Sequence, residues 1–175
     1  MNRRRSLIRL SIAAISLAFA SLATSQESLD DPGKAQIGKV SVTVYYATNG
    51  DAKIAGTKTL DVDQETQQRL RGEERLRFKE YRMLGQDAQP LLRSYENWAQ
   101  PLKPSDEVLI RFMAKSRPTK KATGLDLELW LSRKKVLKTD AVLEGDRPLF
   151  ILGPQWRGGR LIIAVALAPD GKRGS

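Results

Sequence analysis

Apolar and polar residues alternate in several short segments of the chain, and this alternation predicts β-strands. The clearest run is 125–131, where a leucine occupies every second position. Segments 40–46 and 108–114 show the same period, and 136–143 continues it. Segments 149–152 and 161–167 are apolar at successive positions, which is typical of strands buried on both faces at the centre of a sheet. Weaker patterns predict further strands at 78–84 and 91–98.

One helix is expected at 61–77, a segment rich in Gln, Glu and Arg. Asp61 or Asp63 would cap its N-terminus, and its few apolar positions would give it a narrow stripe for packing. Because strands otherwise follow one another with short turns, the expected fold class is α+β and β-rich. It would be an antiparallel meander or sandwich with one surface helix, and either a second sheet or that helix would cover the inner face.

The first 25 residues have a different pattern, that of a cleavable export signal. A basic start is followed by the apolar run Leu10–Ala20 and then by small residues. Cleavage after Ser25 is preferred here to cleavage after Ala20. Two consecutive arginines resemble the core of a twin-arginine signal, but Arg3 departs from that motif, so the ordinary secretory route is favoured. An uncleaved signal would instead tether the protein to a membrane.

The chain therefore divides into an export signal peptide at 1–25, a flexible leader at 26–38, a single β-rich domain at 39–168 and a disordered tail at 169–175. The expected location is the periplasm or the extracellular space. Of the 30 basic residues, Arg3, Arg4, Arg5 and Arg9 lie in the signal. The mature protein keeps 26 basic and 20 acidic residues, so its net charge is +6 rather than +10.

The sequence contains no cysteine and no histidine. No disulfide can form, and the usual general base and imidazole metal ligand are missing. Alternating acids at 61–65 resemble a calcium loop, but Thr66 and Gly72 stand where that loop needs glycine and glutamate. We therefore expect no metal, no cofactor and no catalytic residue.

A basic and aromatic surface is predicted where two turns meet. If the strands from 108 to 167 are successive antiparallel neighbours, their turns alternate between the two ends of the sheet, and the turn at 132–135 lies beside 153–159. The predicted ligand-binding residues are Arg133, Lys134, Lys135, Trp156, Arg157 and Arg160. Cations around an exposed indole suit an anionic or glycan-like partner, whereas export argues against nucleic acid.

Four alternatives stay open at this point. The basic turns can simply be solvated, or they can protect a sheet edge from aggregation. A hydrolase would need paired carboxylates from the acids in the second half of the chain, which are Asp106, Glu107, Asp126, Glu128, Asp140, Glu144 and Asp146. A structural accessory would pair a sheet edge with a partner chain.

In outline the chain resembles uncharacterised exported proteins of Gram-negative-type bacteria. The resemblance rests on the first strand ending in Tyr45-Tyr46-Ala47-Thr48-Asn49, the strand at 78–84 after a helix, and the closing hairpin at 145–167. It implies an envelope location and this layout, and no activity or cofactor. We therefore expect an exported, non-enzymatic binding or assembly accessory whose partner is an envelope protein or an anionic or glycan component.

Overall fold

The computed structural model describes residues 31–115, 122–145 and 147–168. The predicted export signal, residues 26–30 of the leader, the loop 116–121, Asp146 and the tail 169–175 lie outside the described residues. What is expected of those segments stays a prediction.

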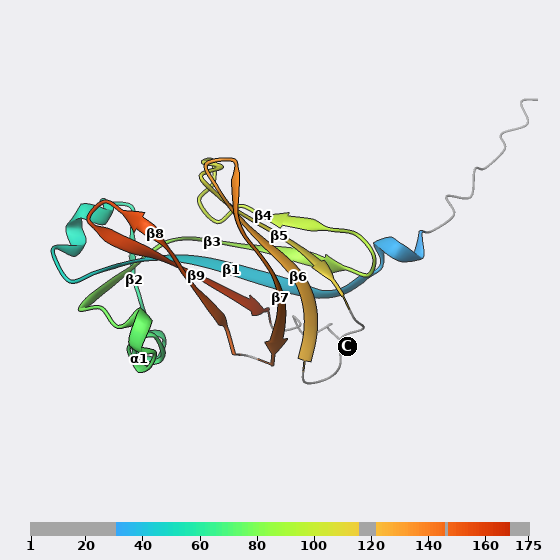
Figure 1. Cartoon of the computed structure of the whole chain (residues 1–175), viewed down its shortest axis with the longest axis horizontal. Coiled ribbons are helices and arrows are strands. Elements are labelled where there is room, and N and C mark those ends of the chain that lie inside the picture. Colours follow the sequence, from blue (N-terminus) through green and yellow to red (C-terminus); the bar gives the residue numbers. More distant parts are fainter. Residues whose placement is uncertain (1–30, 116–121, 146, 169–175) are drawn as a thin grey trace, which may run out of the picture.

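The described residues form strands, one α-helix and short 3-10 helices (Figure 1). The helical segments are η1 (Pro32–Lys34), η2 (Ala52–Ala55), α1 (Gln64–Gly72) and η3 (Glu74–Leu76). The strands are β1 (Gln36–Thr48), β2 (Leu60–Asp61), β3 (Glu80–Leu92), β4 (Asn97–Ala99), β5 (Val108–Ala114), β6 (Ala122–Leu131), β7 (Lys134–Glu144), β8 (Leu149–Trp156) and β9 (Gly159–Leu167).

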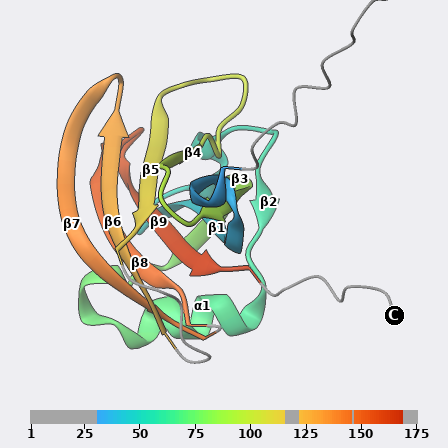
Figure 2. The same ribbon diagram turned by 90° about the vertical axis from the view of Figure 1, so that its right-hand side faces the viewer.

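The strands belong to two antiparallel sheets. The larger sheet has the order β2-β3-β1-β9-β8, and the smaller one has the order β4-β5-β6-β7. Figure 2 shows β5, β6 and β7 side by side as one curved layer, with α1 below the strands. In the larger sheet Val44 of β1 lies between Gly85 of β3 and Ile163 of β9, which fixes the register of its three central strands.

Both sheets contribute to one apolar core. Alternate residues of β1 and β9 meet alternate residues of β5 and β6, because successive side chains of a strand point to opposite faces. Phe112 and Ile110 of β5 and Leu127 of β6 are fully buried in this core. Thus both sheets supply side chains to this core, and α1 supplies none.

The helix packs on the other face of the larger sheet. Its buried residue Leu70 joins Ala47 of β1, Tyr81 of β3 and Ile162 of β9 in a second, smaller cluster. This explains why β9 is apolar on both faces, as expected of a central strand.

Several predicted boundaries need correction. The helix ends at Gly72, where the chain turns extended, and 74–76 form the separate η3. β1 begins at Gln36, inside the expected leader, because Gln36 pairs with Leu92. The predicted strand at 91–98 is wrong: β3 continues from Glu80 through the turn-like residues 85–87 to Leu92, since it pairs with β1 along its length. β4 is a separate strand of three residues.

The region 108–167 is not one sheet. β5, β6 and β7 are consecutive neighbours, but β8 and β9 join the other sheet, so the expected contact between β7 and β8 is absent from the described pairing. β8 is also an edge strand, which corrects the expectation that its two apolar faces place it centrally. Its inner residues pack in the main core and its outer residues Phe150 and Leu152 pack in the cluster under α1.

Within the described residues, no helix combines the length and apolar character that crossing a membrane would need.

Candidate functional site

The β8–β9 turn is a tight two-residue hairpin at one end of the larger sheet. Trp156 pairs with Gly159, and the two residues between them, Arg157 and Gly158, have φ values of 47° and 76°. Positive φ at both central positions is the geometry of a type I′ turn, which matches the twist of the adjoining strands. Figure 1 shows this turn beside η2 at the left end of the molecule.

Residues of β1 contact the β8–β9 turn and fix its position. The Tyr46 hydroxyl donates to the Arg157 carbonyl oxygen at 3.0 Å. A Cβ at Gly159 would lie 2.5 Å from both the Ala47 carbonyl oxygen and the Tyr46 ring. Glycine at this position therefore lets β1 and β9 approach closely enough to fix the turn.

Trp156 links the two sheets and is not the freely exposed indole that the sequence suggested. Its ring is partly buried and meets the Tyr46 ring edge-on, with centroids 5.7 Å apart. Its Nε1 donates to Glu107 Oε1 at 3.2 Å, and the Glu107 carbonyl oxygen accepts from the Ser132 amide at 2.8 Å. Glu107 thus connects the two turns that sequence reasoning placed at one end.

A pocket of about 440 Å³ opens beside the β8–β9 turn, and we call it the turn pocket. It is formed by the end of β1 and the two residues after it, by Phe78 just before β3, and by the hairpin itself. Its lining residues are Thr48, Asn49, Gly50, Phe78, Gln155, Trp156, Arg157, Gly158, Gly159 and Arg160. The lining contains two arginines and no carboxylate.

The two arginines of the turn pocket are fixed by carbonyl oxygens and by the indole. Arg160 donates from Nε and Nη2 to the Gly153 oxygen at 3.1 and 2.9 Å. The Arg157 guanidinium lies 4.4 Å from the centre of the Trp156 ring, and its Nη1 is 3.5 Å from the Ala55 oxygen. Among the described residues neither arginine has an ion-pair partner.

A second pocket, of about 330 Å³, lies on the other side of Arg157. It runs along the segment 55–59 and is floored by Leu84, Leu102 and Trp156. It too has no carboxylate in its lining, and it adds Lys58 as a cation. Arg157 therefore lines two pockets, and the lining of each contains cationic side chains and no carboxylate.

The other predicted cations lie apart from the turn pocket. Arg133 is in the β6–β7 turn, where its Nε pairs with Asp106 Oδ2 at 2.9 Å. Lys135 projects onto the outer face of the smaller sheet, with Nζ 3.4 Å from Glu128 Oε1 and 5.6 Å from the Trp130 ring centre. Lys134 is exposed at the start of β7. The structure thus joins Trp156, Arg157 and Arg160 and separates them from these three residues.

The acids considered for catalysis lie mostly beside cations. Asp126 and Glu128 share the outer face of β6, where Arg111 and Lys138 lie 3.5 to 3.6 Å from their carboxylates. Burial raises the pKa of Glu128, but the hydrogen bond from Trp130 and the positive charges of Lys135 and Arg111 outweigh burial and lower it. A general acid would need the opposite shift. Among the described residues, no group of three or more acids is arranged to hold a metal ion.

Three aromatic residues lie away from the turn pocket and outside the buried core. Tyr95 and Trp98 are 44% and 37% exposed. On the outer face of the smaller sheet, the rings of Trp98 and Trp130 lie 5.7 Å apart, so the indoles of two different strands pack against each other.

Sequence reasoning missed the part of the site that comes from the first half of the chain. Asn49 and Gly50 follow β1, and the pairing of β1 with β9 that carries them to the hairpin is a long-range contact. Glu107 carried no local signal for its contact with Trp156. No family model, curated protein or solved structure matches the chain.

Proposed function

We propose that this protein is an exported, non-enzymatic binding protein of the bacterial envelope, and that the turn pocket takes an anionic group of an envelope glycan. The two sheets would form a β-sandwich that presents the hairpin at one end. The observation that carries the proposal is the pair Arg157 and Arg160, which line one pocket without a carboxylate.

The contrast with the other cations supports this assignment. Arg133 and Lys135 lie against Asp106 and Glu128, so their charges are already compensated. In the turn pocket the guanidinium groups are held by neutral carbonyl oxygens, which orient them and leave their charge uncompensated. Guanidinium groups with remaining N–H donors bind carboxylates and phosphates through charge-assisted hydrogen bonds.

The remaining lining groups favour a sugar-like carrier for the anion. Asn49 and Gln155 are exposed amide side chains, which both donate to and accept from hydroxyl groups. Phe78 adds ring surface on which the apolar face of a sugar can lie, and the Trp156 ring holds the Arg157 guanidinium at the same pocket. The carboxylate-dependent hydrolase is less well supported, because Asp126 and Glu128 lie 3.5 to 3.6 Å from Arg111 and Lys138, whose charges compensate theirs.

A direct test measures equilibrium binding of three probes: a galacturonate trisaccharide, the neutral galactose trisaccharide and inorganic phosphate. The proposal predicts that the acidic sugar binds most tightly and that added salt weakens it. Arg157→Gln or Arg160→Gln should each reduce its affinity about tenfold, the usual effect of losing one charged hydrogen bond.

The matched control is Arg93→Gln, because Arg93 is exposed and does not line the turn pocket. It should leave the affinity unchanged. Equal binding of the acidic and neutral sugars, or equal losses in all three variants, would refute the proposal. If phosphate binds as tightly as the acidic sugar, the pocket binds anions, and the part of the proposal that names a glycan is wrong.

A further inference from the structure

The edges of the two sheets are protected to different degrees. In the described part of the chain they are formed by β2, β8, β4 and β7. β2 and β4 have two and three residues, and such short edges offer little backbone for pairing. β7 is long but carries exposed Lys134, Lys135 and Lys138, and charges on an edge oppose pairing with another chain.

β8 has none of these features in its first half. Residues Leu149–Leu152 are all apolar and all partly buried, and β9 is their only described partner strand. A register shift after Leu152 and the proline at 154 interrupt the second half of the strand. The open stretch of this edge is therefore 149–152, where backbone groups that point away from β9 are available for another strand.

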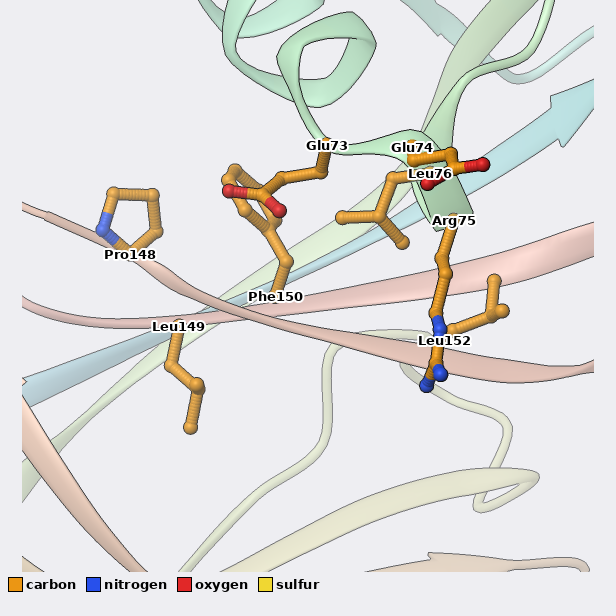
Figure 3. A pocket seen from close by; sticks show the side chains of 8 residues that line it. All are labelled: Glu73, Glu74, Arg75, Leu76, Pro148, Leu149, Phe150 and Leu152. Atoms are coloured by element: carbon orange, nitrogen blue, oxygen red, sulfur yellow. The ribbon is translucent and has the colours of Figure 1, made fainter.

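A groove runs along this open stretch, between β8 and the segment that follows α1. Its volume is about 630 Å³. Figure 3 shows Glu73, Arg75 and Leu76 extending across it towards Phe150 and Leu152, while Leu149 points away. The groove therefore has an apolar floor beside a free backbone edge, and its opposite wall is charged.

The charged wall is mainly acidic. Glu73 and Glu74 are exposed, and among the described residues neither has an ion-pair partner. Arg75 supplies one cation against these two carboxylates. An occupant of the groove would gain from a positive charge that lies next to an apolar side chain.

We propose that the edge of β8 is a strand-addition site for an extended segment of another polypeptide, in which an apolar residue lies between basic residues. The segment would pair with 149–152 and place its apolar side chain over Phe150 and Leu152. Its basic side chains would meet Glu73 and Glu74. Main-chain hydrogen bonds would supply much of the affinity, and the groove would supply the sequence preference.

A second copy of this chain fits the groove less well. A two-fold interface would bring the same patch of each copy together, so both acidic walls would meet at one interface. Residues 149–152 of the second copy contain no basic side chain to face Glu73 and Glu74. The charge balance therefore favours a basic segment of a different chain.

The test uses a fluorescent peptide of sequence Thr-Lys-Thr-Val-Thr-Lys-Thr, in which both lysines and the valine point to the same side of a strand. Its binding to the full protein is measured by anisotropy. Replacing both lysines by glutamate, or methylating the backbone nitrogens on the pairing edge, should each weaken binding at least about tenfold. Slower hydrogen exchange at the amides of 149–152 on binding should locate the peptide at β8.

The protein variants are Glu73→Lys and Glu74→Lys, both on exposed residues, with Glu80→Lys as the exposed control outside the groove. The double variant with both substitutions should bind the lysine peptide about tenfold more weakly. The control and Arg157→Gln should leave the affinity for this peptide unchanged. The proposal would be overturned if the peptide does not bind, or if methylation of its backbone nitrogens does not lower its affinity. So would a dimer in sedimentation whose formation slows hydrogen exchange at the amides of 149–152, since it would assign the edge to a second copy.

Discussion

Arg157 is the first residue of the β8–β9 turn and Arg133 is the second residue of the β6–β7 turn, and their charged groups have different neighbours. Each lies in a two-residue turn with positive φ. Arg157 covers an indole and has no described carboxylate partner, whereas Arg133 pairs with Asp106. Whether the charge of a basic turn residue is paired with a carboxylate thus depends on the residues that the fold brings next to it from distant parts of the chain.

The β6–β7 turn places two non-glycine residues, Ser132 and Arg133, at φ values of 46° and 65°. Left-handed backbone is unfavourable for residues with a Cβ, and glycine relieves this cost. Arg133→Gly should therefore be about 1 kcal/mol more stable to urea than Arg133→Ala. Both variants lose the ion pair with Asp106, so the comparison isolates the backbone. Equal unfolding midpoints would show that the turn is not strained.

At the scale of elements, α1 depends on its cap and on one buried residue. The Thr66 amide donates to Asp63 Oδ1 at 2.8 Å, and Leu70 is the helix residue that reaches the sheet. Sequence reasoning named Asp61 and Asp63 as possible caps. The structure selects Asp63 because Asp61 belongs to β2 and pairs there with Arg82.

The hydrogen bonds from Thr66 lower the pKa of Asp63 below its ordinary value of 3.8. The stabilisation by the ionised cap is therefore complete above pH 3.8 and is lost as the pH falls through the folded value. Asp63→Ala should cost about 1 kcal/mol of unfolding free energy at neutral pH, and the deficit should shrink in acid. Asp63→Asn, which keeps a side-chain acceptor, should cost less. A deficit that does not change with pH would contradict this assignment.

Local patterns predicted elements better than they predicted partners. β1, β5, β6, β7 and β9 lie where alternation or apolar runs placed them, because their side chains face a core. The length of β3 was missed, since Gly85 has the local signature of a turn and only pairing with β1 keeps it extended. The separation of β7 from β8 depends on which sheet each strand joins, and no local pattern encodes that choice.

For the candidate site too, contacts within one hairpin were predicted and contacts between distant segments were not. Trp156, Arg157 and Arg160 are close in sequence and share one hairpin, so the sequence predicted their proximity correctly. Lys135 was expected beside them, but its strand lies in the other sheet and its side chain faces Glu128. Asn49 follows β1 directly and lines the same pocket. Because it is far from the hairpin in sequence, its place in the pocket could not be predicted from the turns alone.

At the scale of the whole molecule, we propose two separate binding surfaces on this protein. The turn pocket gathers positive charge at the β8–β9 turn, and the edge groove places negative charge beside the start of β8. An anionic glycan group and a basic peptide segment would not compete for the same charges. Such a protein could hold a glycan and a partner polypeptide together in the envelope.

The central claim is that an anionic glycan group binds at the turn pocket, and the three tryptophans of the chain allow a direct test. The measurement is a titration with the galacturonate trisaccharide, followed by NMR at the indole N–H of each tryptophan. Only Trp156 lines the turn pocket, while Trp98 and Trp130 lie on the outer face of the smaller sheet. We predict a saturable shift of the Trp156 signal whose midpoint moves to about tenfold higher sugar concentration in Arg157→Gln, with the other two signals unchanged. A Trp156 signal that does not move, or shifts confined to Trp98 and Trp130, would contradict the proposed site.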